Sequence, residues 1–235
     1  RFVPSLDSYF LLPGDLDIPI VFEVERIRDG GSFTTRRVKA IQHGQAIYHL
    51  SASFQLVQDG YEHQMDMPRV SKAEDLPSWE GLAKQFADIL PPNLKRWLDI
   101  KRPIEFRPVE FINPIAKEKY DPVRHVWMRA RGEMPEDRRW HDLVLAYATD
   151  FNLLTTALLP HGLAADFSSL TLASLDHSMW FHRPFRIDDW LLYALDSPSA
   201  SGARGFTRGK VFTTDGQLVA SVTQEGLMRP RAPKS

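Results

Sequence analysis

One short pattern occurs twice in this chain, and its two copies are separated by a nearly constant number of residues. Residues 10–13 (FLLP) match residues 181–184 (FHRP), Ser32 and Phe33 match Gly205 and Phe206, and the turn residues His43 and Gly44 match Asp215 and Gly216. The three offsets are 171, 173 and 172 residues. Three landmarks at one spacing predict that the chain contains two copies of one structural unit.

Both copies have the pattern of antiparallel β-structure, in which alternating residues are apolar and turn residues separate the runs. In the first copy, strands are predicted at residues 2–10, 19–28, 32–41 and 45–55. In the second copy, they are predicted at residues 170–181, 190–196, 205–213 and 217–227, with a turn-rich bridge (SPSASG) at residues 197–202. Two further strands are predicted at residues 106–111 and 125–131.

A long helix is predicted before the second copy only. Asp137 is a suitable N-cap for a helix over residues 138–159, and Pro160 and Gly162 follow the end of that helix. The first copy begins directly on a strand. We therefore expect that the native protein carries an additional upstream segment with a first helix, which this chain lacks.

The segment between the two copies changes character along its length. Residues 57–76 are mostly polar and predict an exposed connection, whereas residues 79–90 have apolar side chains at helical spacing, and Pro91 and Pro92 end that helix. The chain as a whole is predicted to have an α+β fold. Its predicted parts are a first β-rich unit at residues 1–70, a linker with a helix at residues 71–104, and a second unit at residues 105–235.

The composition excludes several classes of protein. With 29 basic and 30 acidic residues among 235, the chain has no overall charge that would favour a nucleic acid or a membrane surface as partner. It has no cysteine, which excludes disulfides and thiolate nucleophiles. No run of 18 apolar residues predicts a membrane-spanning helix. The eight histidines lack the spacing of metal ligands and no glycine-rich nucleotide motif occurs, so neither a metal nor a cofactor is expected.

The first candidate site residue is Asp150 in the predicted helix. Leu143, Tyr147, Asp150 and Leu154 are spaced by 4, 3 and 4 residues, so they lie on one helical face. Such a face predicts that the carboxylate is buried. A buried carboxylate is costly without partners, so Asp150 is either held by structural hydrogen bonds or is a functional group.

Two more candidates interrupt apolar rows on predicted strands. Gln224 follows Leu218, Ala220 and Val222 on one strand face. Ser174 likewise continues the apolar row of Leu170 and Leu172 on its own strand. Taken alone, each of them is more simply explained as a polar residue at a strand end whose hydrogen bonds are satisfied.

Residues 176–178 (DHS) suggest a nucleophilic Ser-His-Asp hydrolase. In a strand, however, Asp176 and Ser178 share a face while His177 points to the opposite one. The three side chains therefore cannot form that triad within the strand. No GxSxG motif occurs elsewhere in the sequence.

Longer motifs in the same regions resemble the acyl-CoA thioesterase II family, the double hotdog thioesterases. These motifs are SLDHSMWFHRPF at residues 174–185, ARGFTRGKVFTTDG at residues 203–216, QEGLMR at residues 224–229, SYFLLPGD at residues 8–15 and SFTTRRVKAIQHG at residues 32–44. The resemblance covers essentially the whole chain. It implies two tandem hotdog folds, each a long helix wrapped by an antiparallel sheet, and it supports the expectation that a first helix is missing.

The resemblance also implies a catalytic set. The family's Asp on the second helix, its Thr or Ser hydroxyl on the next strand and its Gln on the last strand match Asp150, Ser174 and Gln224. The residue of the first copy that corresponds to Gln224 is Ala52, so the first unit looks catalytically degenerate. The implied reaction is hydrolysis of acyl-CoA by one water that the three residues hold, with Asp150 accepting its proton and with no covalent intermediate.

Other functions remain open at this stage. They are a double hotdog protein that binds acyl-CoA without hydrolysing it, a hotdog dehydratase or hydratase, and a purely structural interaction protein. The expected partner is acyl-CoA, with no nucleic acid and no membrane insertion, and family resemblance implies a homo-oligomer. The chain ends in RAPKS, which is not a peroxisomal SKL signal, so a cytoplasmic location is expected, or a peroxisomal one in a eukaryote.

Overall fold

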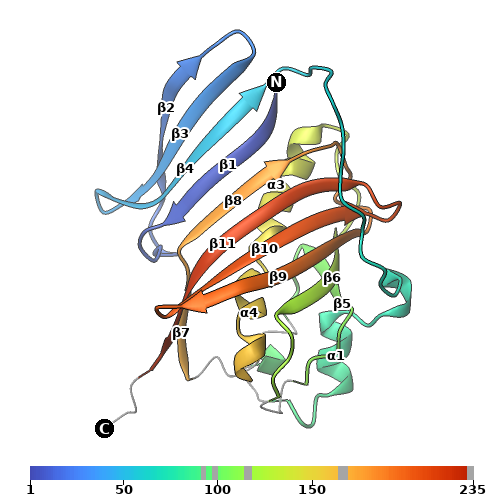
Figure 1. Ribbon diagram of the computed structural model, residues 1–235. Helices are drawn as coiled ribbons and strands as arrows, with labels where there is room; N and C mark the ends of the chain where they lie inside the picture. Colours follow the sequence, from blue (N-terminus) through green and yellow to red (C-terminus); the bar gives the residue numbers. More distant parts are fainter. Residues whose placement is uncertain (91–93, 97–99, 114–117, 164–168, 232–235) are drawn as a thin grey trace.

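The computed structural model of the protein describes residues 1–90, 94–96, 100–113, 118–163 and 169–231 (Figure 1). Its strands are β1 (Phe2–Phe10), β2 (Val21–Asp29), β3 (Phe33–Gln42), β4 (Gln45–Gln55), β5 (Ile104–Pro108), β6 (Val123–Ala130), β7 (Leu170–Ser174), β8 (Asp176–Phe181), β9 (Leu191–Ser201), β10 (Arg204–Thr213) and β11 (Leu218–Pro230). Its helices are α1 (Trp79–Gln85), α3 (Arg138–Thr149) and α4 (Leu153–Thr156), with short 3-10 turns at Ala73–Asp75 and Leu159–His161.

The described strands form one sheet whose order is nearly symmetrical. The order is β2-β3-β4-β1-β8-β11-β10-β9-β6-β5, and β7 pairs with β11 outside this path. The series β2-β3-β4-β1 is thus repeated in reverse by β8-β11-β10-β9. The two halves meet where β1 pairs antiparallel with β8, and there Ser8 lies opposite His177. The repeat in the sequence therefore has a counterpart in the sheet.

Helices α3 and α4 lie against one face of the second half of the sheet (Figure 1). Asp137 caps α3 as predicted, because its side chain accepts a hydrogen bond from the backbone N–H of Arg139 at 3.0 Å. The apolar core forms where Leu145 and Ala148 of α3 meet side chains such as Met179 and Val222 from the sheet. Burial of these side chains holds the helix on the strands that carry Ser174 and Gln224.

The prediction of one continuous helix over residues 138–159 was wrong. Helix α3 ends at Thr149, and the chain then turns through Asn152, whose φ of 75° lies in the left-handed region. Asparagine tolerates this conformation better than most residues. Helix α4 begins again directly after it, and the Thr156 side chain donates to the Asn152 carbonyl at 2.8 Å. Asp150 therefore stands at a helix end, not within a helix.

Two facing glycines let α4 approach the sheet closely. Gly205 of β10 and Gly226 of β11 are opposite each other in the ladder. A Cβ added to Gly226 would lie 2.5 Å from a methyl group of Leu154, and one added to Gly205 would lie 2.6 Å from the Cβ of Ala157. Side chains at these positions would push the segment that follows Asp150 away from β11.

The second half of the sheet differs from the predicted strands in two places. The predicted strand at residues 170–181 is broken at Leu175, because the backbone N–H of Glu225 bonds to the Asp176 side chain at 2.7 Å in place of a ladder partner. The predicted bridge at residues 197–202 is wrong, since β9 continues through Pro198 to Ser201. The ladder tolerates Pro198 because the β9–β10 register shifts beside it. The turn itself lies at Gly202 and Ala203, which both have positive φ.

The later residues of the predicted exposed connection at 57–76 pack on the opposite face of the sheet from α3. Met67, Val70 and Leu76 contact a second apolar cluster that contains Trp127, Trp190, Leu192 and Phe212. The indole N–H of Trp127 donates to the Ser71 carbonyl at 2.8 Å. The later part of the predicted exposed connection is therefore attached to the sheet. Helix α1 is shorter than predicted, and Pro91 and Pro92 lie outside the described residues.

The segment Arg138–His161 is long and apolar enough to cross a membrane by length and composition alone. In the structure the left-handed Asn152 interrupts this segment, and Leu145, Ala148 and Leu153 are fully buried in the core. Its apolar character is therefore explained by its place as the core helix of the second unit.

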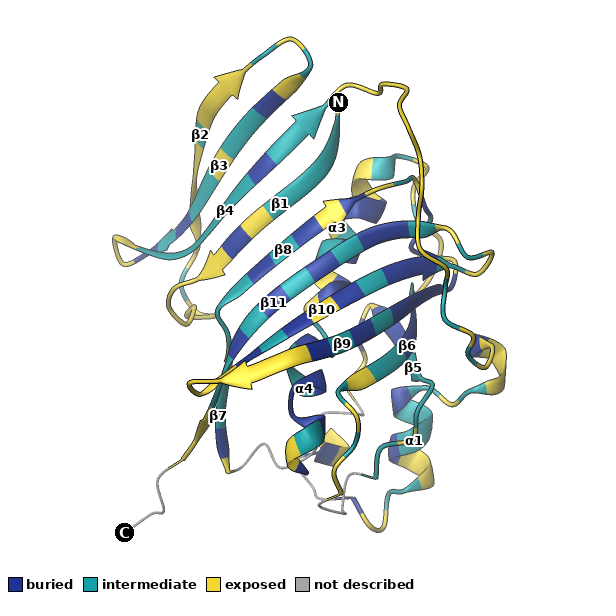
Figure 2. Ribbon diagram, viewed as in Figure 1, coloured by how far each residue is buried: buried dark blue, intermediate teal, exposed yellow. Residues whose placement is uncertain are grey.

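The two halves of the sheet differ in exposure (Figure 2). Along most of β8, β10 and β11, buried residues alternate with half-buried or exposed ones, whereas eight of the nine residues of β2 are exposed. Among the described residues of the first unit, no helix covers β1–β4. Residues of β1 and β4 such as Leu6 and Ala52 instead border a cavity that reaches α3, and Asp150 lines this cavity.

Candidate active site

The structure brings the three predicted site residues together. Asp150 follows the last residue of α3, Ser174 is the last residue of β7, and Gln224 lies on β11. The Ser174 hydroxyl donates to Asp150 Oδ1 at 3.3 Å, and the Gln224 side-chain N–H donates to the same oxygen at 2.6 Å. Two donors from two strands thus converge on one carboxylate oxygen.

The sheet register explains this convergence. Ser174 lies opposite Gly226, which is two residues beyond Gln224 on β11. Positions 224 and 226 of β11 share a face, because side chains two residues apart on a strand point the same way. Gln224 and Ser174 therefore both approach the end of α3. Tyr193 of β9 fixes that helix end, since its hydroxyl donates to the Thr149 carbonyl at 3.0 Å. Gly209 leaves room for the Tyr193 ring, because an added Cβ would lie 2.2 Å from it.

Asp150 is exposed, so the prediction that it is buried was wrong. The helical face that contains Leu143, Tyr147 and Asp150 exists, but it borders the cavity, and Leu143 and Tyr147 are 63% and 51% exposed. The buried face of α3 includes polar side chains that are hydrogen-bonded. His141, for example, accepts from the backbone N–H of Ile187 at 3.1 Å. These satisfied polar residues concealed the true core face from a count of apolar positions.

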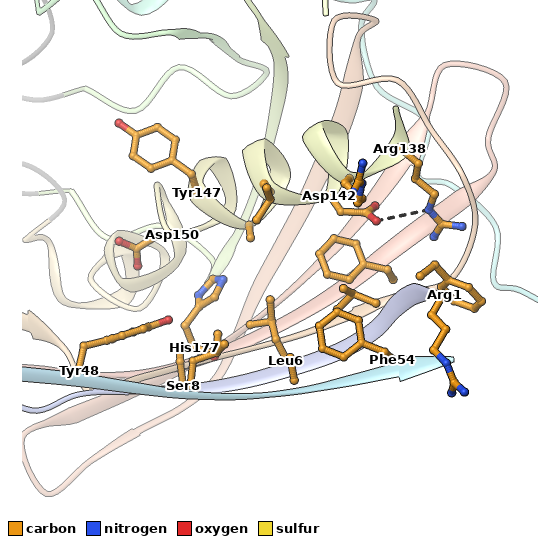
Figure 3. Close-up of a pocket in the computed structure, with 18 of the residues that line it drawn as sticks. Arg1, Leu6, Ser8, Tyr48, Phe54, Arg138, Asp142, Tyr147, Asp150 and His177 are labelled. Atoms are coloured by element: carbon orange, nitrogen blue, oxygen red, sulfur yellow. Dashed lines mark hydrogen bonds and ion pairs between the residues drawn. The ribbon is translucent and has the colours of Figure 1, made fainter. Parts of the chain in front are cut away.

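The cavity beside Asp150 has a volume of about 800 Å³. Figure 3 shows Asp150, His177 and Tyr48 at one end of it and Arg1 and Arg138 at the other, with α3 along one side. Its lining is mostly apolar and comes from β1, β4, β8 and α3. The apolar lining residues are Phe2, Val3, Leu6, Phe10, Leu50, Ala52, Phe54, Leu143, Ala146, Phe151 and Phe181.

The Gln224 carboxamide has one unused acceptor. The Gln224 side chain is 0% exposed, and its Oε1 has no hydrogen-bond partner among the described residues. The orientation of the amide follows from Asp150, because a carboxylate only accepts hydrogen bonds and must therefore face the N–H group. A buried amide oxygen without a partner is unfavourable, and a water molecule is the smallest donor that could satisfy it.

His177 also belongs to this cluster, although it was not among the three predicted site residues. It is 5% exposed, its Nδ1 lies 3.4 Å from Gln224 Nε2, and its Nε2 lies 3.2 Å from the Thr149 hydroxyl. Burial lowers the pKa of His177 below its usual value, and the negative charge of Asp150 opposes this shift. The signal that could have found it is its alternation with Met179 and Phe181, which are buried core residues of the same strand.

The site combines a carboxylate that holds two donors, a free amide acceptor and an apolar cavity. A water placed against the amide oxygen and the carboxylate would be polarised for attack on a carbonyl group. The cavity suits a substrate with a long apolar part. The Asp176 side chain accepts a backbone bond from Glu225, so this residue does not form a triad with His177 and Ser178.

Comparison with known proteins agrees with these features. A family model described as acyl-CoA thioesterase matches residues 95–227, and one described as acyl-CoA thioesterase N-terminal domain matches residues 1–55. Acyl-CoA thioesterase 2 of Haemophilus influenzae is 40% identical over 97% of this chain and 80% of its own length. Acyl-coenzyme A thioesterase 8 of Mus musculus is 43% identical over 97% of this chain and 73% of its own length.

Solved structures show the same architecture. An acyl-CoA thioesterase II, TesB2, from Mycobacterium marinum has a TM-score of 0.80 and 43% identity, covering 99% of this chain and 82% of that one. A protein with a hot dog fold from Alicyclobacillus acidocaldarius has a TM-score of 0.74 at 20% identity, covering 98% of this chain and 80% of that one. The predicted α+β double hotdog fold is confirmed by these likenesses.

Proposed function

Because the chain belongs to the acyl-CoA thioesterase family and is an acyl-CoA thioesterase, we propose that one water held by Asp150, Ser174 and Gln224 hydrolyses the thioester. The products are a free fatty acid and CoA. The observation that carries the proposal is the buried Oε1 of Gln224, which has no hydrogen-bond partner among the described residues. It belongs to the same amide that donates, together with the Ser174 hydroxyl, to the Asp150 carboxylate.

The proposed chemistry assigns one role to each group. Gln224 Oε1 and the free oxygen of Asp150 accept the two hydrogens of the water, so a lone pair of the water points to the thioester carbonyl. As the water oxygen bonds to the carbonyl carbon, its proton passes to Asp150. The C–S bond then breaks, and the CoA sulfur leaves as a thiolate that takes the proton back from Asp150. The Ser174 hydroxyl donates a hydrogen bond to Asp150 Oδ1, the carboxylate oxygen that does not contact the water, throughout the reaction.

The apolar cavity is proposed to receive the acyl chain. Each CH₂ group that leaves water for an apolar surface contributes about 0.8 kcal/mol to binding. The chain would extend from the Asp150 end of the cavity along α3. The thioester carbonyl would then lie beside Asp150, and the CoA portion would remain outside the apolar cavity.

The assignment is tested by Asp150→Asn, with Asp142→Asn in α3 as the matched control. Both residues line the cavity, but Asp142 pairs with Arg138 at 3.4 Å, away from Gln224. Release of CoA thiol is measured over a series of acyl chain lengths. We expect Asp150→Asn to lower kcat by about 10³-fold, within the range for a lost general base, and Asp142→Asn to leave kcat within threefold. A kcat of Asp150→Asn close to that of the wild type would reject the role of Asp150.

A single-turnover reaction in ¹⁸O-labelled water tests the direct attack of water. Direct attack puts the label into the fatty acid in the first turnover. A covalent acyl–Asp150 anhydride that water opens at the Asp150 carboxyl carbon would instead release unlabelled acid first and leave the label in the protein. Label in the protein would therefore reject the proposed mechanism while retaining the activity.

The oligomeric state, the location and the division into units remain proposals for this chain. We propose that it forms a homo-oligomer and acts in the cytoplasm, with the peroxisome as the alternative in a eukaryote. A relative from Saccharomyces cerevisiae that is 24% identical is named peroxisomal acyl-coenzyme A thioester hydrolase 1. The division into units at residues 1–70, 71–104 and 105–235 also stays a prediction.

A further inference from the structure

We propose that His177 is a positioning residue that holds the Gln224 carboxamide in its working orientation. The inference rests on the proposed function, because it gives a purpose to that orientation only if Gln224 Oε1 receives the water. His177 has no role in the proton transfers described above. Its burial and its contacts need a separate explanation.

The hydrogen-bond pattern around His177 has one consistent assignment of protons. The Gln224 amide has two N–H hydrogens, of which one donates to Asp150 Oδ1 and the other points to His177 Nδ1. Nδ1 can accept only if the imidazole proton is on Nε2. That Nε2–H then donates to the Thr149 hydroxyl, 3.2 Å away, and the hydroxyl donates to the Ala146 carbonyl at 3.3 Å.

This chain of bonds connects the backbone of α3 to the Gln224 amide. The Ala146 carbonyl and the Met179 sulfur, each 3.3 Å from the Thr149 hydroxyl, can only accept. The hydroxyl therefore donates to one of them and accepts from the imidazole, which fixes the imidazole tautomer. In the opposite tautomer, Nδ1–H would meet the amide N–H, and two donors would face each other. The neutral imidazole therefore disfavours rotation of the amide, which would put Oε1 against the Asp150 carboxylate.

The first unit provides an internal comparison. At the register that corresponds to His177 and Gln224, with offsets of 171 and 172 residues, Leu6 lies opposite Ala52. The unit without the carboxamide also lacks the imidazole. Both polar side chains therefore occur in the half of the molecule that carries Asp150, which supports their action as a pair.

Two substitutions of similar size separate positioning from space-filling. In His177→Asn, the Oδ1 atom can take the place of Nδ1 and accept from Gln224, while the contact with Thr149 is lost. In His177→Gln, the longer side chain can reach Thr149 but leaves no acceptor at the Nδ1 position. His182→Gln is the control, because His182 bonds to the Ser221 hydroxyl at 2.8 Å, outside the site.

The measurements are kcat and KM for acyl-CoA hydrolysis, with circular dichroism as the check on folding. We expect His177→Gln to lower kcat about 30-fold with KM within threefold, His177→Asn to keep kcat within about fivefold, and the His182 control to keep it within twofold. Equal losses of kcat in His177→Asn and His177→Gln, or a kcat of His177→Gln within threefold of the wild type, would overturn the proposal.

The same substitution in a Gln224→Ala background separates failure of this inference from failure of the proposed function. If His177 acts through Gln224, His177→Gln lowers kcat less than twofold further once the amide is gone. A loss of the same 30-fold in both backgrounds would overturn the positioning role and leave the proposed function intact. Wild-type kcat in Gln224→Ala alone would overturn the proposed function itself, and the positioning role with it.

Discussion

The two halves of the sheet repeat one strand order in reverse, but the three residues that we propose for hydrolysis all come from the second half and its helix. In the first half, Leu6 faces Ala52 across a ladder that is open to the cavity. In the second half, the equivalent positions hold His177 and Gln224, and the end of α3 adds Asp150. The fold thus provides a curved surface in both halves. The chemistry that we propose depends on two polar side chains in place of Leu6 and Ala52 and on where one helix ends.

The largest expected effect comes from giving the second half the residues of the first. The double variant His177→Leu with Gln224→Ala removes both the amide and its positioning group, and we expect kcat to fall about a thousandfold. We also expect it to be more stable than Gln224→Ala alone by about 1 kcal/mol, since the single variant leaves a buried imidazole nitrogen unpaired. Thiol release and urea unfolding measure the two effects.

The contrary result for this double variant is also informative. If it unfolds at a lower urea concentration than both single variants, each side chain stabilises the fold through contacts with other groups as well as with its partner. The difference between the halves would then be structural as well as chemical.

A second, smaller effect is expected at the contact between α4 and the sheet. In Gly226→Ala, the new methyl group would meet Leu154 at 2.5 Å, so we expect a loss of about 1–3 kcal/mol in unfolding free energy and a lower kcat, because Ser174 lies opposite this residue. Adding Leu154→Ala should restore part of both. Gly60→Ala is the control, since nothing lies within 4 Å of its added Cβ. Failure of Leu154→Ala to restore stability would show that the glycine serves the strand and not the helix contact.

The smallest expected effect is the pH dependence that His177 gives the second half. The titratable groups around it are Asp150, Tyr48 from β4 and Tyr193 from β9, with Asp176 on its own strand. Burial raises the pKa of both tyrosines, so they stay neutral near pH 6. Because burial lowers the pKa of His177, the active neutral imidazole persists below pH 6.5, its ordinary value, and kcat should fall only at lower pH.

The free energy of unfolding should also decrease as the pH falls. Below the ordinary pKa of histidine the unfolded chain binds a proton at residue 177, whereas the folded chain does not until its lower pKa is reached. The free energy of unfolding therefore decreases as the pH falls from about 6.5 towards the lowered pKa of His177. In His177→Asn, the contribution of residue 177 to the pH dependence of kcat and of the unfolding free energy should be lost. In His182→Asn, that contribution should be retained. Identical profiles in wild type and His177→Asn would contradict the assignment.

The sequence predicted the repeated strands well, because alternation with a period of two and turn residues such as His43 and Gly44 are local features. It could not predict the helix break at Asn152 or the strand break at Leu175. The second break depends on the bond from the Glu225 backbone to Asp176, which lies 49 residues away along the chain. Local periodicity contains no information about such a distant partner.

For the site, sequence and resemblance together selected Asp150, Ser174 and Gln224, and the structure places them in contact. The burial of Asp150 was predicted wrongly, because a helical face shows which residues lie together and not what covers them. His177 was missed because it was considered only as a member of a triad with Asp176 and Ser178. Its alternation with Met179 already placed it on the core face.

The pairing of β1 with β8 has a consequence for how the enzyme comes apart. Ser8 of β1 donates its hydroxyl to the backbone carbonyl of His177 at 2.9 Å, in addition to the ladder bonds between the two strands. Local opening of the first half would therefore remove a neighbouring strand from the strand that carries His177. The amide hydrogens of β1 and β8 should exchange with solvent in one cooperative step, so opening of the first half would disturb the proposed active site in the second.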